Sequence, residues 1–247
     1  MPKLYIKISI GDLDSTSNTL IHSCFLQFKK MNVSNRIKEF YNSLYNRYGP
    51  QNWWPAESEL ECILGAILTQ NTSWKNVEKA FENLKSRGLL SVEKLDSIPT
   101  KKLANLIRPS GYFNQKAIKI KAFISYVKKT YNGDLDKMFD EDTHELREKL
   151  LRIKGIGPET ADSILLYALK KPVFVIDAYT YRILSRHSMI PNEISYQEMQ
   201  DLLMDSLPED IQVFNEYHAL LVRVGKEHCK RKALCKGCPL EYDPHTV

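Results

Sequence analysis

The stretch LLRIKGIGPETADSIL at residues 150–165 decides the fold. Apolar residues on both sides are in helical register, and Gly155 and Gly157 stand between them. Two glycines one residue apart permit a tight turn and the close approach of another backbone. Pro158 suits the first turn of the second helix, where its missing N–H costs nothing. The stretch therefore predicts two short helices joined by a glycine hairpin.

Such a hairpin can bind a phosphate. The free N–H groups at the start of the second helix attract an anion, and Lys154 adds a positive charge beside them. GxG alone is weak evidence, because ordinary helix corners also contain it. The longer pattern L-x-x-I-K-G-I-G-x-x-T-A, which ends on Thr160 and Ala161, is far more specific. It resembles the helix–hairpin–helix that grips a DNA backbone without reading bases.

The rest of the chain predicts an all-α protein. Apolar stripes of helical period follow one another, and only residues 173–176 look extended. Two short helices are expected around Pro99, and longer ones at 33–48, 60–68, 77–84, 117–127, 146–151, 164–169, 178–187, 196–205 and 211–224.

The first thirty residues differ from this pattern. Residues 3–10 alternate apolar and charged as a strand would, residues 11–19 look like a polar turn, and the clean helical pattern begins just after Met31. We therefore expect residues 1–30 to be an N-terminal extension, or the product of a start codon assigned too early.

Composition sets wide bounds. The 247 residues are 43% hydrophobic, enough for a real core, and the net charge of +5 permits a nucleic-acid partner without demanding one. Five cysteines and no signal-peptide pattern predict a reducing cytoplasm rather than a disulfide scaffold. No apolar run approaches the length of a membrane span.

Asp177 ends the segment PVFVID and directly precedes the next helical stretch. The commonest role for such a residue is a helix N-cap. However, the order of hairpin, apolar run, V-x-D, helix and closely spaced cysteines resembles the helix–hairpin–helix base-excision glycosylases of the endonuclease III superfamily. In that family this aspartate is the catalytic carboxylate, which can stabilise positive charge on the sugar and activate the attacking water.

The resemblance covers about residues 31–240 and implies a two-domain fold. A six-helix barrel domain with the hairpin would span 51–171. A second helical domain would combine 31–50 with 172–247, and the active site would lie in the cleft between them. The implied partner is double-stranded DNA with damaged bases, with no membrane partner, and we expect a monomer.

Two departures narrow the activity. The lyases of the family carry a lysine two residues after the second hairpin glycine, where this chain has Glu159. Without that amine no Schiff base can form there. Members that act on mismatched adenine carry an early glutamate where this chain has Gly65 and Ala66. The first departure argues against a strand-cleaving lyase, and the second argues against an enzyme for mismatched adenine.

What remains looks most like the 3-methyladenine DNA glycosylases of endonuclease III type. The similar segments are WWP at 53–55, LGAILTQNTSW at 64–74, RPSGYFNQKA at 108–117 and KGIGPETADSIL at 154–165. Alkylated purines are cationic and already good leaving groups, so aromatic walls suit them, at ~0.5–2 kcal/mol for a cation over a ring. By resemblance Trp54, Pro55 and Trp74 would line the base pocket, while Trp53 is as well explained by the core.

The base must leave the stack to be reached. By the same resemblance Gln70 and Asn71 would fill the vacated space, and Tyr112 or Phe113 would wedge the opposite strand. Three lysines of the segment that follows are expected to form a solvated face: Lys116, Lys119 and Lys121.

Three cysteines near the C-terminus, Cys229, Cys235 and Cys238, are spaced C-x5-C-x2-C. Related proteins hold a [4Fe–4S] cluster with four cysteines, and here the fourth is absent. Three interpretations remain: a cluster with another fourth ligand, which we favour; zinc bound by the cysteines and His245; or a loop without metal. Asp243 is the other substitute nearby.

The sequence thus predicts a monofunctional DNA glycosylase that excises alkylated purines, with 3-methyladenine as the expected lesion. The alternatives are an endonuclease III-like glycosylase and lyase on oxidised pyrimidines, and a non-catalytic DNA-binding module. Asp177 argues against the module, because binding alone does not need it.

Overall fold

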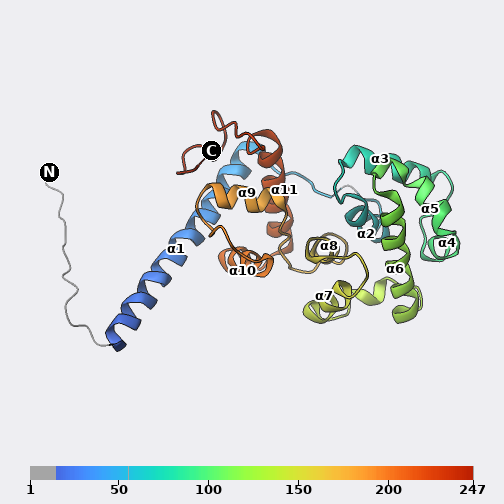
Figure 1. The fold of residues 1–247 in the computed structure, drawn as a ribbon, viewed down its shortest axis with the longest axis horizontal. Coiled ribbons are helices and arrows are strands. Elements are labelled where there is room, and N and C mark those ends of the chain that lie inside the picture. Colours follow the sequence, from blue (N-terminus) through green and yellow to red (C-terminus); the bar gives the residue numbers. More distant parts are fainter. Residues whose placement is uncertain (1–14, 55, 247) are drawn as a thin grey trace.

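The computed structural model describes the backbone of residues 15–54 and 56–246 and the side chains of residues 32–54 and 56–246. This part of the chain is helical and contains no strand (Figure 1). The α-helices are α1 Ser15–Tyr48, α2 Glu59–Leu68, α3 Trp74–Lys85, α4 Val92–Ser97, α5 Thr100–Leu106, α6 Phe113–Tyr131, α7 Thr143–Leu151, α8 Pro158–Ser163, α9 Ala178–Arg186, α10 Tyr196–Ser206 and α11 Ile211–Glu227. Short 3-10 turns occupy Arg108–Ser110 (η1) and Asp136–Met138 (η2), and Ile164–Ala168 (η3) is a π-helix.

Side-chain caps fix where several helices begin. Ser58 accepts a hydrogen bond from the backbone N–H of Glu61 at the start of α2. At α10, Ser195 and Glu198 form a reciprocal capping box. Asp210 accepts from two backbone N–H groups at the start of α11. Each cap satisfies N–H groups that a helix start would otherwise leave without partners.

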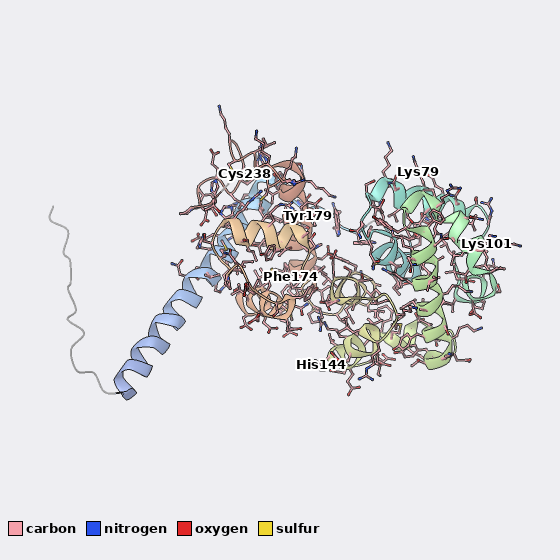
Figure 2. All side chains as sticks on the ribbon, in the orientation of Figure 1. Lys79, Lys101, His144, Phe174, Tyr179 and Cys238 are labelled. Carbon is pink, nitrogen blue, oxygen red and sulfur yellow. The ribbon has the colours of Figure 1, made fainter. Side chains whose placement is uncertain are left out.

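The helices form two groups (Figure 1). Helices α2 to α8 pack together, whereas α1 packs on α10 and α11, and α9 packs on α11. The π-helix η3 contacts α2, α8 and α11, so it joins the two groups. In Figure 2 Phe174, which follows η3, lies in the second group, where its ring meets Phe214 at 5.6 Å. The connection from η3 to α9 is thereby buried as it approaches Asp177.

A buried polar network also ties the groups together. Asp162 of α8 is fully buried and accepts hydrogen bonds from Arg147 Nε at 2.6 Å, Tyr196 OH at 2.7 Å and Gln200 Nε2 at 2.8 Å. Gln200 also donates to the backbone carbonyl of Phe174 at 2.6 Å. A buried carboxylate is tolerated only when it is paired in this way, and losing one partner costs about 3–5 kcal/mol.

One expectation about the N-terminus is wrong. The helix that should begin after Met31 begins at Ser15, and its first part projects away from the other helices (Figure 1). Residues 15–19 are therefore helical rather than part of a turn. The physical reason is that α1 contains no glycine or proline, so nothing stops the helix. The expected strand at 3–10 lies outside the described residues.

Candidate active site

Asp177 stands at the start of α9 and is only 12% exposed. Its Oδ1 accepts hydrogen bonds from the backbone N–H of Thr180 at 2.8 Å and from the Thr180 hydroxyl at 3.0 Å. The residue is therefore the N-cap of α9, which was the simplest interpretation of its sequence position. Its other oxygen, Oδ2, faces a second buried group. Because capping uses only Oδ1, Asp177 can cap α9 and still use Oδ2 in a reaction.

That second group is His218 of α11, which the sequence did not single out. Its Nε2 lies 3.7 Å from Asp177 Oδ2, and its Nδ1 lies 2.6 Å from the hydroxyl of Tyr167. Tyr167 belongs to η3 and is buried. The only sequence signal is a histidine within the buried stripe of α11, where an ordinary core histidine would look the same.

Electrostatics at Asp177 favour the carboxylate. Burial by itself would raise the pKa of this group, but the His218 contact and the two Thr180 donors outweigh burial, so the pKa of Asp177 lies below its usual value. A nearby carboxyl behaves differently. Partial desolvation, and then the charge of Asp177, raise the pKa of Glu159 on α8, although its side chain still meets solvent.

The aromatic side chains near Asp177 form a row. Trp54 stacks on Tyr167 with ring centroids 4.8 Å apart and planes inclined by 23°. The edge of Trp74 meets Trp54 at 5.3 Å. Trp54 also lies against Gly65 of α2, where a Cβ atom would approach its ring within 3.2 Å. A side chain at position 65 would crowd the indole of Trp54, so the packing of this ring on α2 explains why glycine stands there.

The other expected pocket residues have different surroundings. The ring of Trp53 packs edge-on against Trp54 at 6.1 Å, and the ammonium of Lys226 lies 5.5 Å from its centroid. The Nε1 atoms of Trp53 and Trp54 are buried without a hydrogen-bond partner among the described residues. Pro55 lies outside the described residues.

The glycine hairpin joins α7 to α8 as expected. Gly155 has φ +88°, and a Cβ there would come within 2.5 Å of the Lys119 stem, so this position requires glycine. Gly157 has φ −97° and open space around it, so only one of the two glycines is needed for the turn. Lys154 is exposed beside them.

The turn after α2 is fixed to the hairpin. Gln70 Nε2 donates to the Thr160 hydroxyl at 2.8 Å, and the Lys119 ammonium donates to Gln70 Oε1. Thr160 was expected to contact DNA, but it is buried and its hydroxyl accepts the hydrogen bond from Gln70. Asn71 is exposed, in the left-handed region with φ 53°. Gln70 would have to exchange these partners to enter DNA, whereas Asn71 is free to do so.

The loop before α6 presents an aromatic side chain to solvent. Tyr112 is 71% exposed and left-handed, with φ 45°. Phe113 is half-buried, and Arg108 lies over its ring at 5.6 Å. Of the two predicted wedge residues, Tyr112 is therefore the accessible one.

The expected solvated face of lysines is wrong. Lys116 is 2% exposed, and its ammonium donates to the carbonyls of Leu68 at 2.8 Å and Ser110 at 2.6 Å. Burial, with a smaller effect of Lys119, lowers the pKa of Lys116 to about 8. Lys121 donates to carbonyls at the end of α4. These lysines hold backbone carbonyls because helix and loop ends leave acceptors without partners.

The three cysteines line one cavity between α9, α11 and the C-terminal loop (Cys238 in Figure 2). Within the described part of the chain, however, no group of three or more His, Cys, Asp or Glu side chains is placed to hold a metal ion. Cys229 Sγ instead accepts a hydrogen bond from Arg186 Nη1 at 3.1 Å. As placed, these thiols form neither the expected cluster site nor the zinc site with His245.

The proposed substitute ligand Asp243 already has partners. Arg36 binds both of its oxygens, at 2.9 and 2.6 Å, and His187 Nδ1 lies 2.7 Å from Oδ2. Arg186 donates to the carbonyls of Lys230 at 2.7 Å and Arg231 at 2.9 Å. Arginine contacts therefore hold the C-terminal loop against α1 and α9.

The hairpin, the capped carboxylate and the aromatic row define a helix–hairpin–helix glycosylase. A family described as HhH-GPD superfamily base excision DNA repair protein matches residues 64–209. The chain therefore belongs to the HhH-GPD superfamily and is a DNA glycosylase of base excision repair.

Particular relatives agree. The chain is 47% identical to MJ1434 of Methanocaldococcus jannaschii, named as a predicted DNA repair glycosylase, over 86% of this chain and 97% of that protein. The structure of 3-methyladenine DNA glycosylase (MagIII) of H. pylori, bound to 1,N6-ethenoadenine, is 30% identical with a TM-score of 0.68, covering 82% of this chain and 99% of that one. Endonuclease III, trapped as a covalent intermediate with DNA, is 20% identical with a TM-score of 0.74, covering 85% and 94%, and supports the fold.

Within the described residues, every helix is too short or too polar to cross a bilayer.

Proposed function

We propose that this glycosylase is monofunctional and hydrolyses the N-glycosidic bond of alkylated purines such as 3-methyladenine in DNA, with Asp177 as the catalytic carboxylate. The observation that carries the proposal is the row of rings from Trp74 through Trp54 to Tyr167, which leads by way of His218 to Asp177. An aromatic wall beside an ionised carboxylate suits a flat, cationic base and a sugar that becomes cationic.

The chemistry needs little help at the leaving group. An alkylated purine already carries positive charge, so the base departs without a general acid. As the bond breaks, positive charge develops on the sugar and the fixed Asp177 carboxylate stabilises it. The same carboxylate can then accept a proton from the attacking water. Its lowered pKa keeps it ionised for both tasks.

The monofunctional assignment rests on Glu159. A lyase needs an amine nucleophile, and the carboxyl at this position cannot form a Schiff base. The lesion class rests on the aromatic row and on the likeness to the H. pylori enzyme, whose structure contains a modified adenine. We propose that Tyr112 and Asn71 enter the duplex while the flipped base occupies the aromatic pocket.

A panel of lesion duplexes tests the proposal. Single-turnover base release would be measured on duplexes that contain 3-methyladenine, 7-methylguanine, hypoxanthine, an oxidised pyrimidine, uracil, or thymine opposite guanine. Fastest release of 3-methyladenine is the expected result. Preference for the oxidised pyrimidine, with strand cleavage, would establish the lyase alternative, and preference for a deaminated or mismatched base would overturn the alkylpurine assignment.

The cluster remains a separate hypothesis. A [4Fe–4S] cluster at Cys229, Cys235 and Cys238 would require the thiols to converge and a fourth ligand to join them. Iron, zinc and sulfide analysis of protein purified without oxygen tests this. Four irons per chain would show that the loop rearranges to bind a cluster, and the base-release chemistry proposed above does not depend on the outcome.

A further inference from the structure

His218 is a buried polar side chain with one nitrogen that lacks a hydrogen-bond partner. Its side chain is 93% buried, being 7% exposed, and Nε2 is unpaired among the described residues. Leaving such a group unsatisfied costs about 1–3 kcal/mol. Nε2 points to Asp177 Oδ2 at 3.7 Å, which is within ion-pair range but longer than a hydrogen bond.

The other nitrogen decides which atom carries the proton. Burial, and then the charge of Asp177, raise the pKa of Tyr167 well above its usual value, so its hydroxyl is neutral. If that hydroxyl donates to Nδ1, neutral His218 carries its proton on Nε2. If His218 is protonated, Nε2 also carries a proton. The remaining tautomer would aim a lone pair at the Asp177 carboxylate, which electrostatics disfavour.

We propose that His218, oriented by Tyr167, is a positioning residue that fixes the second oxygen of Asp177 and keeps the carboxylate ionised during base release. The inference rests on the proposed catalytic role of Asp177. Thr180 fixes Oδ1 by two donors, so one contact to Oδ2 is enough to stop rotation of the carboxylate. We expect the 3.7 Å separation to shorten when lesion DNA binds, as catalytic contacts commonly do.

The arrangement also links base recognition to the catalyst. Tyr167 stacks on Trp54 with one face and holds His218 through its hydroxyl. A base that packs against Trp54 thereby presses on the residue that orients His218. Trp54, Tyr167 and His218 thus form one series of contacts from the proposed base pocket to Asp177.

Other titratable groups also face this site. Glu159 of α8 interacts with both Asp177 and His218, and Cys62 of α2 and Asp177 both act on Tyr167. Glu159 is the group whose ionisation could mimic a His218 effect. The test is therefore repeated in a Glu159→Gln background, where that source of pH dependence is absent.

The sign of the expected pH effect follows from the groups present. Because the pKa of Asp177 is lowered, excision persists at acidic pH and is lost as pH falls through that pKa. Without the His218 contact, less remains to offset the effect of burial, and so the pKa of Asp177 rises. The acidic limb of the pH–rate profile then moves to higher pH.

Three variants test this on 3-methyladenine DNA, whose cationic base needs no protonation. His218→Phe should move the acidic limb up by about one pH unit or more and slow the plateau. His218→Gln keeps an N–H donor near the Nε2 position and should return the acidic limb most of the way to its wild-type position. Tyr167→Phe removes only the orienting hydroxyl and should give a smaller shift in the same direction.

Affinity for a duplex with an abasic-site analogue serves as the structural control and should remain near wild type in all three. If His218→Phe binds the abasic-site duplex normally but the acidic limb of its pH–rate profile does not move, the inference is overturned. It is also overturned if His218→Phe and His218→Gln give the same pH–rate profile. If His218→Phe does not fold, Tyr167→Phe decides by the same criterion. Full activity of Asp177→Asn would instead reject the proposed catalyst, so the two failures are distinguishable.

Discussion

Trp54 and Tyr167 stack at 4.8 Å although they are more than a hundred residues apart, one preceding α2 and the other within η3. The contact joins the first group of helices to the element that bridges both. Trp74 closes the row from the start of α3. The helices that carry the proposed base pocket and the proposed catalytic residue therefore meet at one pair of rings.

Trp74→Ala should weaken excision of 3-methyladenine by about tenfold, the equivalent of about 1.4 kcal/mol, because one aromatic wall is lost. Affinity for undamaged DNA should change much less. Trp74→Phe is the matched control and should retain most of the rate. Equal losses in excision and undamaged-DNA binding would show that Trp74 is structural, a role its contact with Phe81 could support.

Asp177→Asn should lower single-turnover excision by about a thousandfold, because a neutral amide cannot stabilise the cationic sugar. Asparagine is a good N-cap, so α9 and the thermal stability should survive. Asp210→Asn makes the same change at the cap of α11 and should leave excision unchanged. Rapid excision by Asp177→Asn would place the catalyst elsewhere.

Borohydride should trap no covalent complex between the wild-type enzyme and lesion DNA, because Glu159 offers no amine. Strands should break only after alkali treatment. Glu159→Lys places an amine on α8 near Asp177 and provides a positive control for trapping. An adduct with the wild-type protein would revive the lyase alternative and direct attention to another lysine.

Gly155→Ala should lower the free energy of unfolding by about 1–3 kcal/mol, because alanine at φ +88° is strained and its Cβ displaces the Lys119 stem. Gly157→Ala is the control, with ordinary φ and open space, and should lie within about 0.5 kcal/mol of wild type. Urea unfolding measures both. Similar losses in the two variants would contradict the hairpin geometry.

Much of the fold could be predicted because the helices carry their own signals. The apolar stripe expected at 60–68 corresponds to α2, and the stripes at 178–187 and 196–205 correspond to α9 and α10 within one or two residues. Burial of one helix face requires that period. The start of α1 was misplaced although the sequence holds a signal for it: Leu20, Cys24 and Phe28 repeat at helical spacing before Met31, and no glycine or proline interrupts them.

The site was less accessible to sequence reasoning. Asp177 and the tryptophans occur in recognisable segments, whereas His218 acquires its significance only when α11 packs beside α9 and η3. Lys116 did leave a clue. It precedes Ile120 by four residues and so belongs to the buried stripe of α6 rather than to the solvated face.

Lys116 has a consequence for how damage is found. Its ammonium bonds the end of α2, just before Gln70 and Asn71, to Ser110, just before Tyr112. We therefore expect the two turns that would enter DNA to move together. Turns that move together would enter most readily where the DNA is easily bent and unstacked on both strands, so we expect DNA deformability to contribute to the choice of site.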